Sequence, residues 1–279
     1  MKHASAPAPS SPAPAPASSH VVEVREVSVA FDGPPVLTDI SFSIAPAETR
    51  ILLGPAGVGK SVLLKLIIGL IPPLKGDIML FGQDISHMPE EKLFALRARA
   101  GMVFQEGALF DSLSVRDNVA YQLIQERVPD DQIDSRVHEA LSFVGLAETF
   151  SMDPPSLSGG MRRRVAIARA LIHQPELILY DSPTGGLDPV TSTTIIELIV
   201  KQRDVNATPS LLVTHRLQDA FTLCNHRYDS EKGCMVPLPP GQTDPNTTFL
   251  MLEDGRLIFD GSLDELVHSQ NSFVREFLE

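Results

Sequence analysis

A glycine-rich segment constrains the fold of this chain more than any other part of it: Gly54-Pro-Ala-Gly-Val-Gly-Lys60-Ser61. The segment matches the spacing G-x-x-x-x-G-K-[ST], which average composition would produce in a chain of 279 residues only about once in a hundred times. The pattern predicts a strand at Arg50 to Leu53 before the segment and a helix at Ser61 to Leu70 after it. The segment is therefore expected to form the turn between a strand and a helix of an α/β fold.

The residue types of this loop predict ATP and Mg²⁺ as its ligands. Gly57 and Gly59 let backbone N–H groups turn inward around phosphates, and Lys60 adds a positive charge. Ser61 can place its hydroxyl on Mg²⁺ at the start of the helix. The alternative, a glycine-rich turn with a surface lysine, is disfavoured by the full match. The residues predicted to bind ATP here are Gly54, Pro55, Ala56, Gly57, Val58, Gly59, Lys60 and Ser61.

Composition limits the classes of protein to consider. The 43% hydrophobic content is ample for a buried core, and a net charge of −12 argues against a nucleic-acid partner held by bulk electrostatics, although Arg162 to Arg164 form a local basic run. The most apolar run, Val62 to Leu74, is shorter than the roughly 20 residues that cross a bilayer, and the N-terminus lacks a secretory signal. Two cysteines are too few for a disulfide framework. We expect a cytoplasmic protein.

Strands and helices alternate along most of the chain. Residues 1–20 are mostly Ala, Pro and Ser and predict a disordered tail, with the folded domain at 21–279. The helix-rich stretch at about 106–163, in which Ile133, Val137 and Leu141 share one helical face, predicts a subdomain inserted into a largely parallel sheet. Strands are predicted at Val22 to Val29, Ile40 to Ile44, Arg50 to Leu53, Gly101 to Phe104, Leu177 to Tyr180 and Ser210 to Val213.

Two features are predicted near the C-terminus. Asp254-Gly255 lies between two apolar runs and predicts a hairpin, which a final helix follows. A Pro-rich insertion at about 225–248 is predicted to be a surface loop, to which the sequence assigns no role.

A second acidic element is needed to hold the metal. The apolar run Leu177 to Tyr180 ends in Asp181, about 120 residues after the glycine-rich loop, and a buried strand that ends in a carboxylate suits this role. The run is followed by Pro183-Thr184-Gly185-Gly186-Leu187-Asp188-Pro189. An aspartate at the end of a strand is common by itself, but this order of segments makes it a candidate Mg²⁺ ligand.

In this order of motifs the chain resembles the ATP-binding subunits of ABC transporters from about Val21 to the C-terminus. The discriminating motif is Leu157-Ser158-Gly159-Gly160-Met161, which is similar to the family's signature sequence; alone it would more often be a helix N-cap. The resemblance implies a P-loop NTPase fold with a RecA-like parallel sheet core, N-terminal antiparallel strands and an inserted helical subdomain. It also implies that Ser158, Gly159 and Gly160 close on ATP held by a second subunit, so that two copies enclose two nucleotides.

The resemblance assigns four more positions. It implies that Gln105 contacts Mg²⁺ and the attacking water, and that His215 contacts the γ-phosphate. It places Phe31 against the adenine ring and Asp188 in the loop that couples the two sites. Each has a plainer alternative, a polar strand end for Gln105, a structural histidine for His215 and a core ring for Phe31.

One position departs from the family. The residue after Asp181 is Ser182, whereas the family places there a glutamate that polarises the attacking water. Loss of such a base costs about 10²–10⁴ in rate, or roughly 3–5 kcal/mol of barrier. We expect an ATPase that binds ATP-Mg²⁺ tightly and hydrolyses it slowly. Three explanations stay open: His215 or Gln105 positions the water, a partner ATPase supplies a competent site, or Ser182 is an engineered trap.

Within the family the chain is most similar to Mla-type ATPases, which energise phospholipid traffic between bacterial membranes. The most telling stretch is Gly107-Ala108-Leu109-Phe110 after Gln105. The resemblance implies a multi-span permease, an MCE-domain protein and a second ATPase subunit, in a homodimer or heterodimer, as partners, and a place on the inner face of the cell membrane. Phe110, Leu113 and Val115 are candidate permease contacts or, with equal weight, core residues of the subdomain.

Two other functions are compatible with the motifs. The first is a non-transport ABC protein that acts on ribosomes or DNA, although such proteins usually fuse two domains or add a coiled coil. The second is an ATP-gated dimerisation module with little hydrolysis, which Ser182 favours.

Overall fold

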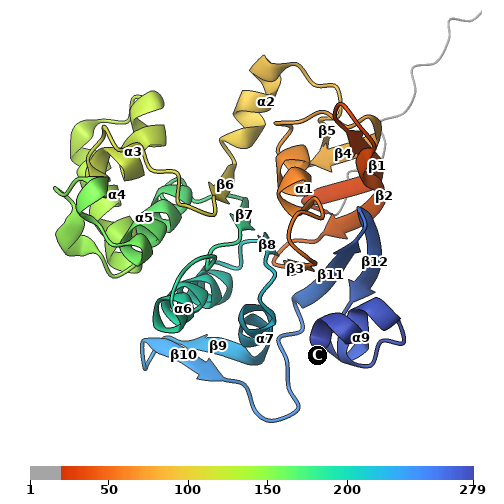
Figure 1. Ribbon diagram of the computed structural model, residues 1–279. Coiled ribbons are helices and arrows are strands. Elements are labelled where there is room, and N and C mark those ends of the chain that lie inside the picture. The colour runs from red at the N-terminus through yellow and green to blue at the C-terminus, as the bar shows by residue number, and fades with distance from the viewer. Residues whose placement is uncertain (1–19) are drawn as a thin grey trace, which may run out of the picture.

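The computed structural model describes residues 20–279, which form two main sheets with helices packed around them (Figure 1). The predicted N-terminal tail, apart from His20, lies outside these residues. The strands are β1 (Val22–Ala30), β2 (Pro35–Ile44), β3 (Thr49–Leu53), β4 (Lys75–Leu80), β5 (Gln83–Asp84), β6 (Ala100–Val103), β7 (Leu177–Asp181), β8 (Ser210–Val213), β9 (His226–Asp229), β10 (Cys234–Pro237), β11 (Thr247–Glu253) and β12 (Arg256–Gly261).

The helices surround these strands, and none of those formed by residues 20–279 is long and apolar enough to cross a bilayer. The α-helices are α1 (Lys60–Ile67), α2 (Glu90–Arg97), α3 (Val115–Gln125), α4 (Asp130–Phe143), α5 (Gly159–Leu171), α6 (Pro189–Asn206), α7 (Leu217–Asn225), α8 (Leu263–Val267) and α9 (Ser272–Leu278). Two short 3₁₀ turns are η1 (Ala147–Thr149) and η2 (Pro154–Ser156).

The central sheet has the strand order β12-β11-β3-β8-β7-β6. The five strands from β11 to β6 are parallel, and β12 pairs antiparallel at one edge. Every residue of β3, β7 and β8 is buried, as expected of parallel strands covered on both faces. The predicted, largely parallel sheet is confirmed, and the predicted strands fall within a few residues of their observed bounds.

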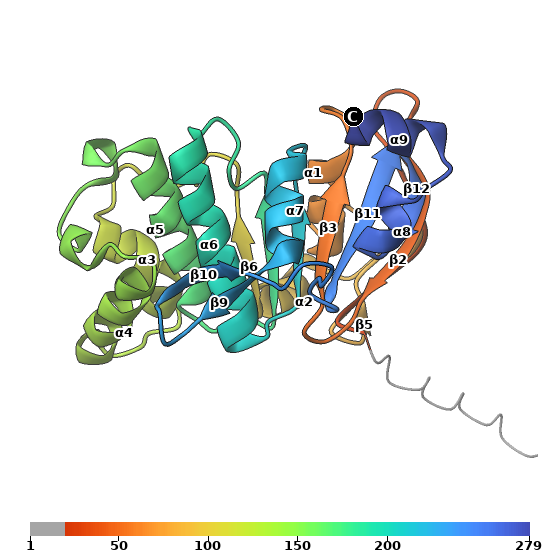
Figure 2. The same cartoon turned by 90° about the horizontal axis from the view of Figure 1, so that it is seen from below.

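Alternate side chains of the central strands enter two separate cores. Ile51 and Leu53 of β3 point into a core that α3 to α9 share, whereas Leu52 points into a core that α1, α2 and the N-terminal strands share. Figure 2 shows α6 and α7 on one side of the strands. The period of two in a strand therefore decides which layer each residue stabilises.

The second sheet is antiparallel, with the order β2-β1-β4-β5. It contains the predicted N-terminal strands, and β4 and β5, which the sequence did not predict, complete it. Helix α1 ends at Ile67, earlier than predicted, because Gly69 turns into a left-handed conformation (φ +66°) that ends the helix. A side chain at Gly69 would also collide with Leu93 of α2.

The predicted inserted segment contains α3, α4 and the start of α5 (Figure 1). Ile133, Val137 and Leu141 of α4 are buried on one face as the spacing predicts, and they pack with Val144 and Leu123. Helix α5 continues to Leu171 and reaches the central sheet, so it extends past the expected boundary at residue 163.

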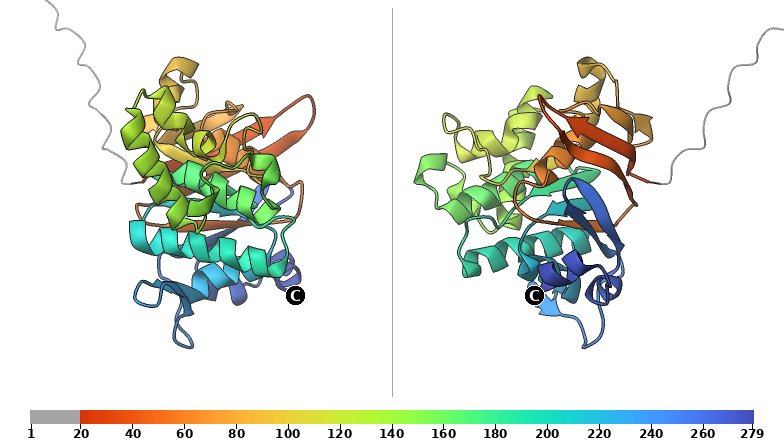
Figure 3. Two further views of the ribbon diagram at one scale, coloured as in Figure 1. Left: turned by 90° about the vertical axis from the view of Figure 1, so that its left-hand side faces the viewer. Right: turned by 45° about the vertical axis from the view of Figure 1, so that its right-hand side comes forward.

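The expectation of a surface loop at 225–248 is wrong for its first half. Strands β9 and β10 form an antiparallel hairpin that lies against α6 (Figure 3). Two side chains of α6 accept hydrogen bonds from the backbone of this hairpin. Asp204 Oδ2 accepts from the Tyr228 N–H at 2.6 Å, and Glu197 Oε1 accepts from the Met235 N–H at 2.8 Å. These contacts satisfy strand edges that would otherwise be unpaired. The predicted C-terminal hairpin at Asp254-Gly255 is confirmed as β11 and β12.

Candidate active site

The glycine-rich loop joins β3 to α1, and two of its glycines leave no room for a side chain. Gly54 has φ +146°, and a Cβ there would lie 2.6 Å from the carbonyl oxygen of Leu252 on β11. Gly59 precedes α1 with φ +107°, and a Cβ there would lie 2.7 Å from the side chain of Leu37 on β2. The path of the loop is therefore set by close contact with both sheets.

Lys60 is buried and folds back across this loop. Its Nζ donates to the carbonyl oxygens of Gly54 at 2.8 Å and Pro55 at 2.7 Å. Burial lowers the pKa of Lys60, and the negative charge of Asp181 opposes this shift. The side chain places a cation inside the loop, at the N-terminus of α1, which is an arrangement that suits a phosphate group.

Ser61 and Asp181 come together although 120 positions separate them. Ser61 Oγ donates to Asp181 Oδ1 at 3.0 Å, and Asp181 is buried at the end of β7. A hydroxyl and a carboxylate are hard oxygen ligands of the kind that Mg²⁺ prefers, with phosphate and water as its other ligands. No group of three or more His, Cys, Asp or Glu side chains within residues 20–279 could hold a metal by itself. The two side chains fit Mg²⁺.

The loop after Asp181 is held tightly by its backbone. Ser182 has a left-handed conformation (φ +47°), and its N–H donates to the Val213 carbonyl oxygen at 2.9 Å. A Cβ at Gly185 would lie 3.5 Å from the side chain of Gln105, so the structure brings Gln105 to this loop. The Ser182 residue is buried, and it adds no carboxylate.

His215 and Phe31 are placed at chain ends of strands. His215 follows β8, the strand between β3 and β7, and its residue is exposed. Phe31 follows β1 and is 55% exposed, so its ring is free of the core that the plainer alternative gave it. Both side chains are therefore available to a ligand.

The signature segment and Asp188 lie together at the starts of two helices. Ser158 caps α5 by accepting from the Met161 N–H at 3.3 Å, and Asp188 caps α6 by accepting from the Thr191 N–H at 3.0 Å. Hydrogen bonds from Thr191 lower the pKa of Asp188. A Cβ at Gly160 would lie 2.4 Å from Thr191, so the two helix starts are in contact. Within residues 20–279, no hydrogen bond or ion pair joins the segment Ser158 to Gly160 to the glycine-rich loop.

Comparison with known proteins decides the family. The ABC transporter family model matches residues 37–185, a span that contains the glycine-rich loop, the signature segment and Asp181. The chain belongs to the ABC transporter family. It is 30% identical to the intermembrane phospholipid transport system ATP-binding protein MlaF of Haemophilus influenzae, over 94% of this chain and 91% of that protein.

Two further comparisons agree with this assignment. The chain is 38% identical to the probable ribonucleotide transport ATP-binding protein mkl of Mycobacterium leprae, over 92% of this chain and 68% of that protein. A solved dimeric ATP-binding cassette in a post-hydrolysis state with ADP and Pi superimposes with a TM-score of 0.73 at 26% identity, over 87% of this chain and 98% of that one. The predicted P-loop NTPase fold and the resemblance to Mla-type ATP-binding subunits are confirmed.

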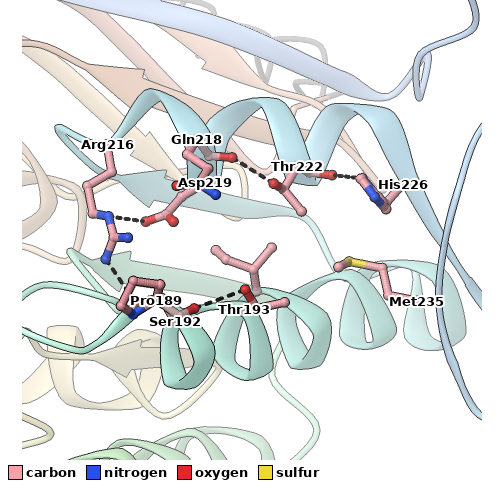
Figure 4. A pocket seen from close by; sticks show the side chains of 10 residues that line it. Pro189, Ser192, Thr193, Arg216, Gln218, Asp219, Thr222, His226 and Met235 are labelled. Atoms are coloured by element: carbon pink, nitrogen blue, oxygen red, sulfur yellow. Dashed lines mark hydrogen bonds and ion pairs between the residues drawn. The ribbon is translucent and has the colours of Figure 1, made fainter.

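A polar cluster that the sequence did not predict lies beside this site, at a cavity of about 180 Å³ between α6 and α7 (Figure 4). Arg216 Nη1 donates to Ser192 Oγ at 2.8 Å, and its Nε lies 3.7 Å from Asp219 Oδ2. Thr184, in the loop after Asp181, also donates to Asp219. Burial raises the pKa of Asp219, and Thr184, Arg216 and His215 oppose the shift. The only sequence signal was the i,i+3 spacing of Arg216 and Asp219.

Proposed function

We propose that two copies of this chain, or this chain and a related subunit, bind two molecules of ATP-Mg²⁺ and so drive transport by a membrane permease. The observation that carries the proposal is the pairing of Ser61 with Asp181 beside the buried Lys60, because it places a cation and two magnesium ligands at one helix N-terminus. Membership of the ABC transporter family supports the coupling to transport.

The residues of one chain divide the work of holding the nucleotide. Backbone N–H groups of Ala56 to Ser61 and the Lys60 ammonium bind the phosphates, and the exposed ring of Phe31 stacks on adenine. Ser61, Asp181 and Gln105 would hold Mg²⁺, which when bound neutralises charge that builds up on the phosphate oxygens.

The second chain completes each site. Ser158, Gly159 and Gly160 of one subunit close on the γ-phosphate held by the other, and Asp188 couples the two sites. Two facts support this division: the signature segment contacts the start of α6 and makes no hydrogen bond to its own glycine-rich loop within residues 20–279, and a related cassette has been solved as a dimer.

Hydrolysis is proposed to be slow because Ser182 offers a hydroxyl where a carboxylate base is needed. Gln105 and His215 are the residues that orient the attacking water, and a hydroxyl is a poor acceptor for its proton. If Ser182 allows no turnover at all, the chain acts as an ATP-gated dimerisation module, which is the second candidate function and rests on this residue alone.

An apolar patch on the helical subdomain is the proposed permease contact. Phe110, Tyr121 and Ile124 are 44%, 41% and 40% exposed, and the rings of Phe110 and Tyr121 lie 4.9 Å apart. Val115, one of the predicted contacts, is fully buried in the subdomain core, so the structural alternative holds for this residue. Leu113 is half-buried.

We propose a cytoplasmic location at the inner face of the cell membrane, with an MCE-domain protein as a third partner and no nucleic acid. Phospholipid is the proposed cargo because the chain aligns with 91% of MlaF, which is named for phospholipid transport. It aligns with only 68% of mkl, which is named for ribonucleotide transport. The test is purification of the tagged full chain from membranes. Co-purification of a multi-span subunit, and ATP-dependent phospholipid transfer between vesicles by that complex, are expected. Co-purification with ribosomes or DNA would contradict the transport proposal.

A further inference from the structure

The side chain of Arg163 joins two segments of the site that lie far apart in the sequence. Arg163 is on α5, three residues after Gly160, and it is 5% exposed. Its Nη1 donates to the carbonyl oxygens of Ser182 at 3.1 Å and Pro183 at 3.0 Å, and its Nη2 donates to that of Gly185 at 3.3 Å. One guanidinium therefore holds most of the loop that follows Asp181.

Burial of the Arg163 charge costs free energy that its hydrogen bonds do not fully offset. The three hydrogen bonds go to neutral carbonyl groups, and Nε is buried without a partner in the described part of the chain. Burial lowers the pKa of Arg163, and the carboxylate of Glu106 opposes that shift. A buried charge whose hydrogen bonds all go to backbone carbonyl groups adds little net stability, so its contribution is the specific geometry that it enforces.

The neighbouring arginines of α5 show that the basic run has no single role. Arg162 binds the Asp111 carboxylate at 3.0 Å, and Arg164 donates to the carbonyl oxygens of Val144 and Gly145 at 3.2 and 3.3 Å. Both contacts lie in the helical subdomain. The middle residue of the run reaches the loop after Asp181, and its neighbour Arg164 supplies a matched control.

We propose that Arg163 is a positioning residue that couples the two ATP sites of the dimer. The inference rests on the proposed function, in which the start of α5 contacts the nucleotide of the opposite subunit while the loop after Asp181 serves the chain's own nucleotide. Both are attached to α5, one at its N-terminus and the other through Arg163. When the dimer closes and α5 is displaced, the movement therefore reaches Ser182 and Gly185. It also reaches the side chain of Gln105, which lies beside Gly185.

The test compares Arg163→Met with Arg164→Met in the full-length chain. The dependence of ATP turnover on ATP concentration gives kcat, KM and the Hill coefficient, and ADP binding reports on the glycine-rich loop alone. For two coupled sites the Hill coefficient approaches about 2, and we expect Arg163→Met to lower it to about 1 and to reduce kcat about tenfold. ADP affinity is expected to change less than about twofold, and Arg164→Met is expected to keep the original Hill coefficient.

Arg163→Lys keeps a positive charge and a donor, so it should retain more of the cooperativity than Arg163→Met does. If Arg163→Met does not fold, Arg163→Lys is compared with the unaltered chain in its place. A purely structural role predicts instead that the melting temperature and kcat fall together while the Hill coefficient stays constant. That outcome would overturn the coupling role. An equal fall of the Hill coefficient in Arg164→Met, or non-cooperative turnover by the unaltered chain, would also overturn it. Failure of the unaltered chain to bind ADP or ATP would overturn the proposed function instead.

Discussion

Two loops meet at Asp181, and the backbone of each is held in a defined conformation. Their side chains, however, carry different chemistry. The glycine-rich loop has everything that binding requires in one chain: glycines that fit between two sheets, a buried lysine and a serine bonded to Asp181. The loop at Ser182 to Gly185 is fixed by Arg163 and by Val213, yet it presents a hydroxyl where hydrolysis needs a base. A loop can thus keep its backbone geometry without the reactive side chain, so binding and hydrolysis are expected to separate in this protein.

Ser182→Glu is expected to produce the largest effect, because it restores a carboxylate to a loop whose backbone is already in place. Turnover should rise about 10²–10⁴-fold, while the affinity for ATP should change little. Steady-state hydrolysis with and without the substitution measures the effect, and Ser182→Ala is the control that should leave the low rate unchanged. A rate that Ser182→Glu does not raise would remove the contrast between the loops.

Lys60→Ala should weaken ATP binding about 10- to 100-fold, because a charged donor to the phosphates contributes roughly 1.5–3 kcal/mol. Titration with a fluorescent ATP analogue measures the change. Lys65→Ala removes an exposed lysine from the same helix and should bind as the unaltered chain does. Equal affinities in both variants would mean that the buried lysine does not face the nucleotide.

Gly54→Ala tests how strictly the shape of the binding loop is set. Its Cβ would lie 2.6 Å from a β11 carbonyl oxygen, which cannot move without disturbing the sheet, so we expect a loss of about 2–3 kcal/mol in the free energy of unfolding. At Gly57, φ is also positive but no atom lies within 4 Å of the added Cβ, and the expected loss is about 1 kcal/mol. Urea denaturation distinguishes the two; equal losses would show that the contact with β11 is unimportant.

The smallest expected effect concerns Asp219, which is bonded to the loop after Asp181 through Thr184. Burial raises the pKa of Asp219 in the folded state, so folding favours its protonated form. Burial of the ionised carboxylate therefore lowers the free energy of unfolding near pH 7, and this loss is relieved as the pH falls through the folded-state pKa. The stability of the unaltered chain relative to Asp219→Asn should increase on acidification, as measured by urea denaturation between pH 7 and pH 4. A constant difference would contradict it.

The sequence predicted the binding loop well because its contacts are local. The spacing of Gly54, Lys60 and Ser61 determines a turn and the start of a helix, whatever the rest of the chain does. The strands of the central sheet were also predicted, because strands buried on both faces appear as short apolar runs. Asp181 was predicted to hold Mg²⁺ with Ser61 because it ends a buried apolar strand, and the structure brings the two side chains together.

The features that were missed depend on contacts between distant segments. The β9–β10 hairpin lies in an insertion whose prolines, from Pro237 onward, come at its end and after it. The hairpin is ordered by Asp204 and Glu197 of α6, which no local pattern of the insertion reveals. The run Arg162 to Arg164 looked like one basic patch, although its side chains point to different partners because successive residues on a helix face different directions. The bonds of Arg163 were therefore not predictable from spacing.

The most direct test of the separation between binding and hydrolysis is to identify the nucleotide that the full chain retains. The unaltered protein is incubated with radiolabelled ATP and Mg²⁺, freed of unbound nucleotide by rapid gel filtration, and assayed for bound ATP and ADP over time. We predict a dimer that retains two molecules of intact ATP for many minutes, and a Ser182→Glu variant that converts them to ADP. Rapid conversion to ADP by the unaltered chain, at a rate that Ser182→Glu does not increase, would contradict the account.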